Sequence, residues 1–111
     1  MKEIVVDGVK YIPEPVMAQN YHIVRTYSAG VYAGEIVKRE GKEVTMRNAR
    51  RIWHWEGAAS LSQLAMEGTK NPDGCKFPCE VAEVLLLEAN EILSVTEAAQ
   101  KSIRGVSVWK R

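Results

Sequence analysis

Three arginines stand directly ahead of two tryptophans in the segment RNARRIWHW, residues 47–55. Guanidinium groups beside aromatic rings suit a site that holds a phosphate and a nucleobase together, because the planar guanidinium fork takes phosphate oxygens while a ring stacks. The same segment is also typical of a strand end with flanking charges, in which case the tryptophans belong to the core. Anion binding is therefore the first chemistry that the sequence indicates, with a structural role as its alternative.

Alternation along a strand decides which arginine would share a surface with the indoles. It places Arg51 on the face of Trp53 and Trp55, and Arg50 on the opposite face with Ile52. Arg51 is thus the arginine that we expect beside both rings.

The chain lacks the patterns of common catalytic sites. It contains no nucleophile elbow, no phosphate-binding loop of the Walker type and no dinucleotide fingerprint. His22 and His54 are single residues in strand-like segments, which is more typical of structural or surface histidines than of catalysts. Zinc needs four ligands, and Cys75 and Cys79 together with the two histidines do not have the spacing of a known zinc site. We therefore expect two free thiols, no metal, no cofactor and no enzymatic activity.

Composition sets the class of protein and of partner. The 111 residues predict a single domain, residues 1–111, and a hydrophobic fraction of 46% is that of a folded globular chain. Fifteen Lys and Arg against fourteen Asp and Glu give a net charge of +1. Binding to long nucleic acid depends on many released counterions, so this balance argues against it and leaves a small anionic ligand compatible.

Location is predicted from what the sequence does not contain. No run of eighteen apolar residues and no signal-peptide pattern is present, so we expect a soluble cytoplasmic protein without membrane contact. Two cysteines are too few for a disulfide scaffold, which favours a reducing compartment.

The first half of the chain is rich in strand patterns. Asp7-Gly8 between two β-branched runs predicts a hairpin, and Pro13 and Pro15 would end its second strand. Residues 21–27 and 31–39 each predict a strand, and the turn at 40–43 leads from the second of these to VTMR, which predicts a further hairpin.

The second half adds two helices. Ser60 and Gln63 have capping-box spacing, and Gly68 supplies a left-handed stop, so residues 60–68 predict a helix. The loop that follows, residues 69–79, is rich in turn residues and carries the only phenylalanine, Phe77.

Residues 80–95 fit either a helix or a buried strand, and we predict one strand with a bulge near Asn90. Thr96 would cap a last helix, with Arg104 in its last turn and Gly105 as its stop, before a short edge strand at 106–109. The predicted fold class is therefore α+β, a mainly antiparallel β-sheet with two short helices.

A pocket for an adenine nucleotide follows from these placements. Arg51 and Arg25 lie in strands, and the loop brings Phe77 as an aromatic plane on which a ring stacks while arginines take the phosphates. The alternative for Phe77 is a hydrophobic plug that fills the core beneath the loop.

Nearly the whole chain, residues 4–111, resembles a known family. The run YHIVRTYSAGVYAGEIVKREGKEVTMRNARRIWHWEGAASLSQLAMEG, followed by CKFPCEV and the closing SVWKR, is similar to the phage-encoded anti-Thoeris proteins, the first-described family of Thoeris anti-defence proteins. The stretch NARRIWHWEGAASLSQLA is the most specific part of the likeness.

The resemblance implies a viral counter-defence protein that serves immune evasion in the host–virus interaction. Such proteins bind and sequester the cyclic ADP-ribose isomers, glycocyclic ADP-ribose among them, that bacterial TIR-domain immune enzymes make, and they do not degrade the signal. They assemble as homodimers with ligand pockets at the dimer interface, and some form hexamers, trimers of dimers, that also hold cyclic trinucleotides at separate sites. The resemblance does not fix the assembly of this chain.

The resemblance also implies a set of pocket residues. Phe77 would stack on adenine, and Arg104 together with Arg51 would contact the phosphates, with Arg50 as the alternative to Arg51 if the register differs. The ligand-binding residues expected in this chain are Arg25, Arg51, Phe77, Asn90 and Arg104.

Three alternatives of other classes remain from the sequence. An enzyme that cleaves a cyclic nucleotide would change the mass of its ligand. A small nucleic-acid-binding or protein-binding module would show a steep salt dependence if it bound oligonucleotides. A purely structural assembly protein would use its tryptophans and its leucine-rich strand only as an interface.

Overall fold

The computed structural model describes the backbone of residues 4–6, 9–11 and 15–110, and the side chains of residues 15–110. Strands β1 (Ile4–Val6) and β2 (Val9–Tyr11) pair antiparallel as a two-stranded sheet, with Val6 opposite Val9. The hairpin predicted there is confirmed for its strands. Its turn residues and Pro13 lie outside the described residues.

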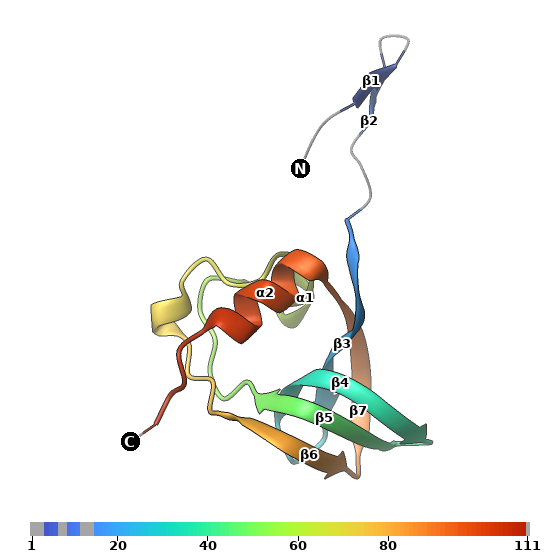
Figure 1. The fold of residues 1–111 in the computed structure, drawn as a ribbon, viewed down its shortest axis with the longest axis vertical. Coiled ribbons are helices and arrows are strands. Elements are labelled where there is room, and N and C mark those ends of the chain that lie inside the picture. Colours follow the sequence, from blue (N-terminus) through green and yellow to red (C-terminus); the bar gives the residue numbers. More distant parts are fainter. Residues whose placement is uncertain (1–3, 7–8, 12–14, 111) are drawn as a thin grey trace.

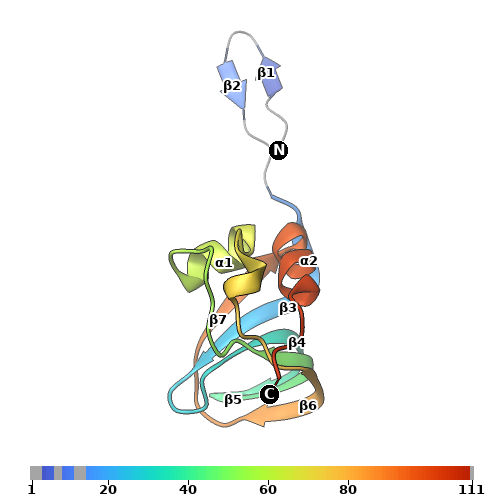
Figure 2. The ribbon, with the colours of Figure 1, turned by 90° about the vertical axis from the view of Figure 1, so that its left-hand side faces the viewer.

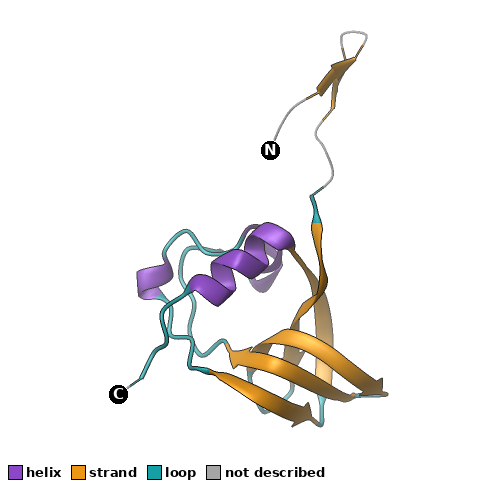
Figure 3. Ribbon diagram, viewed as in Figure 1, coloured by secondary structure: helices purple, strands orange, loops and turns teal. Residues whose placement is uncertain are grey.

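A five-stranded antiparallel sheet and two helices form the rest of the fold (Figures 1 and 3). The strands follow one another in the order β6-β5-β4-β3-β7. Their bounds are β3 (Met17–Thr26), β4 (Val31–Glu40), β5 (Glu43–Arg51), β6 (Glu80–Leu86) and β7 (Ala89–Thr96). The helices are α1 (Leu61–Glu67) and α2 (Glu97–Gly105), with a 3₁₀ turn at Pro72–Gly74. The predicted α+β class, a mainly antiparallel sheet with two short helices, is confirmed.

The sheet coils until its two edges meet at one end. Strands β6 and β7 are the edge strands, yet only Leu87 and Glu88 separate them in the chain, and so short a link reaches roughly 10 Å. The Tyr27 amide donates to the Glu88 carbonyl at 3.0 Å, and the Ala89 amide donates to the Lys42 carbonyl at 2.9 Å. Figure 2 shows the strands curving round beneath the helices.

The prediction of one strand over residues 80–95 is therefore wrong, because the chain breaks at 87–88 and changes edge. The break contains no glycine or proline and directly follows an apolar run, so the sequence pattern does not indicate a turn there. The bulge predicted near Asn90 is confirmed, since the pairing of β3 with β7 shifts register between Arg25 and Thr26, opposite this residue.

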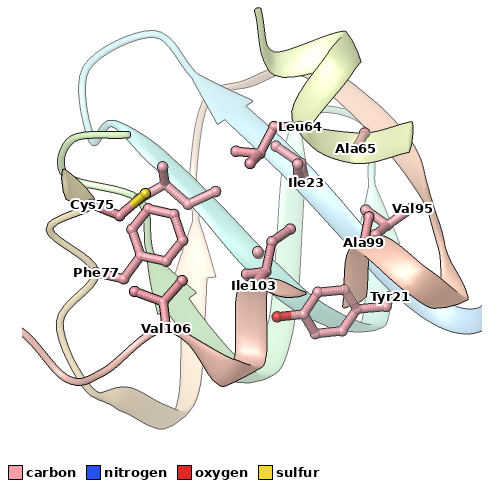
Figure 4. Packing of buried hydrophobic residues seen from close by; sticks show 12 residues of the cluster. Tyr21, Ile23, Leu64, Ala65, Cys75, Phe77, Val95, Ala99, Ile103 and Val106 are labelled. Carbon is pink, nitrogen blue, oxygen red and sulfur yellow. The ribbon is translucent and has the colours of Figure 1, made fainter. Parts of the chain in front are cut away.

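Both faces of the sheet carry buried residues. On one face, Ile23 and Ala33 pack with residues of the two helices, and Figure 4 shows this cluster from close by. On the other face, Val24, Tyr32 and Met46 form a second buried cluster inside the coil of the sheet. Adjacent residues of β3 thus point into different clusters, as pleating requires.

Helix α1 begins and ends where local residue chemistry predicts. The Ser60 hydroxyl accepts from the Gln63 amide at 3.2 Å, while the Gln63 side chain accepts from the Ala59 amide at 2.8 Å. Gly68 has a φ of 76°, and its amide donates to the Leu64 carbonyl at 2.9 Å. The predicted cap and stop of this helix are confirmed.

Helix α2 begins where the sequence predicts, but it ends differently. The Thr96 hydroxyl accepts from the Ala99 amide at 3.0 Å, and Arg104 lies in the last turn, as predicted. Gly105 is not a left-handed stop: it is the last helical residue, and the chain leaves through Val106 in an extended conformation. The edge strand predicted at 106–109 is reduced to a single bridge between Val108 and Phe77.

Neither helix within the described ranges has the length and apolar character that crossing a bilayer requires.

Candidate functional site

Arg50 is a buried cation that binds backbone carbonyls. Its side chain comes from the end of β5, and the residue is 3% exposed. Its guanidinium donates to the carbonyls of Pro78 at 2.8 Å, Ile103 at 2.9 Å and Phe77 at 3.0 Å. Burial lowers the pKa of Arg50, because desolvation disfavours its charge. These contacts fasten the 69–79 loop and the end of α2 to the sheet.

Phe77 lies in the hydrophobic core and is 0% exposed. Its ring belongs to the helix-side cluster with Cys75, Ile103 and Val106 (Figure 4), and the Arg50 guanidinium covers it at 5.5 Å from the ring centroid. A ring closed in this way offers no face to an adenine. The stacking role expected for Phe77 does not fit this placement, and the alternative of a core plug does.

Arg104 is an expected site residue that lines an open pocket at the end of α2. Its Nε donates to Glu80 Oε2 at 3.2 Å and its Nη2 to Glu80 Oε1 at 3.5 Å. The two side chains are 48% and 31% exposed. A surface pocket of about 340 Å³ opens here, lined by Arg50, Glu80, Arg104, Val106 and Val108. Two guanidinium groups, one carboxylate and an apolar wall thus meet in one place.

Arg51 lies on the other face of the sheet from this pocket. Its guanidinium stands over the Tyr32 ring, 4.8 Å from the centroid, and donates to the Tyr32 hydroxyl. Tyr32 belongs to the cluster inside the coiled sheet, whereas Arg50, one residue earlier, faces the helices. The structure therefore brings Arg50, and not Arg51, to the pocket of Arg104.

The tryptophans do not flank Arg51 as predicted. Strand β5 ends at Arg51, so the alternation stops before Trp53. Trp53 is 61% exposed and stacks on Trp109, with centroids 6.4 Å apart and planes within 5°. Lys76 lies over the Trp109 ring at 5.8 Å. The Trp55 indole, half-buried, donates to the Ala58 carbonyl at 3.1 Å.

Arg25 and Asn90 lie elsewhere in the chain. Arg25 pairs with Glu91 at 3.4 Å between two half-exposed side chains. Asn90 lines a different pocket, of about 460 Å³, at the junction of the β4–β5 turn and the start of β7, together with Arg39 and Lys42. Within one chain the structure therefore does not gather the five expected residues, and only Arg104 lies in the pocket described above.

Two residues of this region were missed from the sequence. Glu80 lies opposite Arg50 in the pairing of β5 with β6, which only the register reveals. Tyr21 is buried, and its hydroxyl has no hydrogen-bond partner among the described residues. Figure 4 shows this hydroxyl directed toward the part of α2 that carries Ile103. Burial, reinforced by Glu80, raises the pKa of Tyr21 to about 12, so it stays a neutral hydroxyl.

The histidines and cysteines are scattered. His22 is partly buried, its Nδ1 has no partner within the described part of the chain, and burial lowers its pKa. His54 pairs with Glu56 at 3.2 Å on the surface. Cys75 is buried and Cys79 exposed, both as free thiols. No group of three or more metal-ligating side chains occurs among the residues described.

Comparison with known proteins gives the chain a family. The family model described as "Domain of unknown function (DUF6948)" matches residues 19–103, which contain the five-stranded sheet from its third residue on, α1 and most of α2. No curated protein and no solved structure matches the chain. Because this match covers more than half of the chain, the protein belongs to the DUF6948 family.

Proposed function

We propose that this protein binds a cyclic ADP-ribose isomer and sequesters it without cleaving it. In this account it is a phage counter-defence protein in the cytoplasm of an infected bacterium, and its ligand is the signal, such as glycocyclic ADP-ribose, of a TIR-domain immune enzyme. The sequence resemblance to the anti-Thoeris proteins suggests the ligand class. The single structural observation that supports it is Arg104, whose half-exposed side chain lines an open pocket.

Arg104 supplies the chemistry that a pyrophosphate needs. A guanidinium takes two phosphate oxygens at once, and such charge-assisted hydrogen bonds contribute roughly 1.5–3 kcal/mol each. Val106 and Val108 provide an apolar wall beside it, and the pocket volume of about 340 Å³ lies at the lower end for ligand sites. A nucleotide of two sugars would extend beyond it, which is in keeping with a pocket completed by a second copy of the chain in a homodimer or in a hexamer built from dimers.

The remaining expected residues enter the proposal differently. Phe77 is left out, since its ring is covered in the core. Arg51, Arg25 and Asn90 lie away from Arg104 within one chain, so they would reach the same ligand only from a second subunit. Asn90, with Arg39 and Lys42, lines a second pocket that is the place to look for a cyclic trinucleotide.

Sequestration sets a demand on affinity. A protein that does not turn over its ligand must bind it below the threshold of the effector, and a nanomolar dissociation constant corresponds to about −12 kcal/mol. Two charge-assisted hydrogen bonds from Arg104 supply at most about half of that. Further contacts with the base and sugars are therefore required.

Calorimetric titration tests the proposal. The full chain would be titrated with glycocyclic ADP-ribose, with cyclic ADP-ribose and with linear ADP-ribose as the uncyclised control, and light scattering would report its mass with and without ligand. Submicromolar binding of a cyclic isomer, tighter than that of linear ADP-ribose, is the expected result. Absence of binding to every cyclic isomer would contradict the proposal, and a cyclic trinucleotide titrated afterwards would show whether the second pocket takes one.

A further inference from the structure

We propose that Glu80 occupies the anion-binding groups of Arg104 in the unliganded protein, so that it weakens the binding of every anion that enters the pocket. This inference rests on the proposed function for the identity of the natural ligand, but the competition itself concerns any phosphate. A ligand must displace the Glu80 carboxylate from the guanidinium and then bind beside its remaining charge. Glu80 therefore competes with any incoming anion for this guanidinium, and removal of its charge strengthens anion binding in the pocket.

The pairing geometry carries this inference. Two carboxylate oxygens of Glu80 face two nitrogens of Arg104, at 3.2 and 3.5 Å, which is the bidentate arrangement that a phosphate would adopt. The pair joins elements that are distant in sequence, since Glu80 is the first residue of β6 and Arg104 lies in the last turn of α2. Both residues line the same pocket, so the contact lies within the space that a ligand would enter.

The pair is weak enough to be exchanged. Its side chains are 48% and 31% exposed, and ion pairs that water reaches contribute about 0–1 kcal/mol to stability. The backbone of Glu80 is held in the sheet opposite Arg50, so a displaced carboxylate swings on its own side chain and stays near the pocket. Its charge therefore continues to repel a bound anion.

The charges around the pocket still favour an anion when Glu80 is present. Arg50 and Arg104 are positive and Glu80 is negative, so the described lining residues leave one surplus positive charge. The hydrogen bonds of Arg50 go to three carbonyls, so no carboxylate neutralises it by direct contact within the described part of the chain. A pyrophosphate therefore still gains from the two cations, and Glu80 offsets part of that gain.

Inorganic pyrophosphate is the probe that tests this inference directly. Binding would be followed by calorimetry and by the side-chain Nε–H signal of Arg104 in NMR spectra, for the wild type, Glu80→Gln and Glu83→Gln. Glu83 is the matched control, because it is a surface glutamate of the same strand that pairs across from Arg47 and does not line the pocket. Coincident backbone spectra of the three proteins would establish that each is folded.

Glu80→Gln is expected to bind pyrophosphate about tenfold more tightly than the wild type, since removal of one nearby charge acts on a doubly charged ligand. Glu83→Gln should stay within about twofold of the wild type, because its charge is distant and screened. Equal effects of the two variants, weaker binding by Glu80→Gln, or no pyrophosphate binding by any of them would overturn the inference. A further variant, Arg104→Lys, keeps the charge but removes the fork, and it should weaken pyrophosphate binding relative to the wild type.

The same variants separate this inference from the proposed function. If Glu80→Gln tightens pyrophosphate binding while no cyclic ADP-ribose isomer binds to any of the proteins, the competition by Glu80 stands and the proposed function fails. If the wild type binds a cyclic isomer but Glu80→Gln and Glu83→Gln behave alike toward pyrophosphate, the function stands and the role of Glu80 is wrong.

Discussion

The Arg50 guanidinium lies over the Phe77 ring at 5.5 Å and also donates to the backbone carbonyl of the same residue at 3.0 Å. A cation and an aromatic ring that the sequence offered as ligand groups thus contact each other. This contact closes the loop against the end of α2, where Arg50 also binds the Ile103 carbonyl. Arg104, one residue further along the helix, is left as the exposed cation of the pocket.

Arg50→Lys should destabilise the protein by about 2–4 kcal/mol, because a lysine cannot reproduce three directed hydrogen bonds to buried carbonyls. Urea denaturation followed by circular dichroism measures this change. Arg51→Lys is the matched control, since the exposed Arg51 side chain contacts only the Tyr32 ring and hydroxyl among the described contacts, and it should cost less than about 1 kcal/mol. Equal losses of stability in the two variants would mean that the hydrogen bonds of Arg50 to the three carbonyls do not stabilise the fold.

Phe77→Ala should cost about 3–5 kcal/mol of stability, as expected for truncation of a buried aromatic ring. Phe77→Leu should recover part of that loss, because leucine fills much of the space. Thermal denaturation of both variants gives the comparison. A fully stable Phe77→Ala that no longer binds nucleotide would instead restore the stacking role that the buried position argues against.

Arg104→Gln should weaken binding of a cyclic ADP-ribose isomer at least tenfold while changing stability by less than about 1 kcal/mol. Arg47→Gln is its matched control, because Arg47 also pairs with a glutamate, Glu35, at 3.5 Å on the surface but does not line the pocket of Arg104. Calorimetry on both variants decides the matter. A comparable loss in Arg47→Gln would point to general electrostatic attraction and away from the pocket.

Acid should weaken the fold partly through His22. Its pKa is lowered by burial, so the unfolded chain takes up the proton first, and stability falls as the pH drops below the ordinary histidine value of 6.5 toward the folded value. His22→Gln should flatten the stability profile between pH 7 and about 5. Urea midpoints at several pH values test this, and an unchanged slope in His22→Gln would show that His22 is not the group responsible.

Tyr21→Phe should leave stability unchanged or raise it by about 1 kcal/mol, since the buried hydroxyl has no partner among the described residues. At high pH the raised pKa of Tyr21 makes the stability of the wild type depend on pH. The unfolded tyrosine ionises near 10 and the native one at about 12, so the wild type loses stability as the pH rises through this range, and the variant lacks this contribution. Ultraviolet titration of tyrosinate gives the native pKa. A loss of stability in Tyr21→Phe well beyond 1 kcal/mol would reveal a hydrogen bond of this hydroxyl.

Local chemistry made much of the fold predictable. The capping side chains of Ser60 and Thr96 accept from amides three residues further along the chain, so the starts of both helices can be predicted from a few neighbouring residues. The alternation of Ile23 and Val24 was harder to interpret, because a coiled sheet buries residues on both faces and hides the usual contrast between polar and apolar positions. The change of edge at Leu87 and Glu88 depends on the coil of the whole sheet and leaves no turn residue in the sequence.

The site was less predictable, because its contacts span the fold. Arg104 could be placed in the last turn of a helix, but its partner Glu80 lies 24 residues away and meets it only through tertiary packing. The expected surface of Arg51 with Trp53 failed because β5 ends at Arg51. Phe77 could not be assigned to the ligand or to the core until the position of α2 over the loop was known.

The most direct test of the central claim is the chemical state of a ligand after binding. The purified protein would be equilibrated with a stoichiometric amount of glycocyclic ADP-ribose, freed of unbound ligand by gel filtration, denatured by heat, and its released small molecules identified by mass spectrometry. The account predicts release of the intact cyclic molecule in an amount close to that of the binding sites. An opened or smaller product would identify an enzyme, and the absence of any retained nucleotide would contradict sequestration.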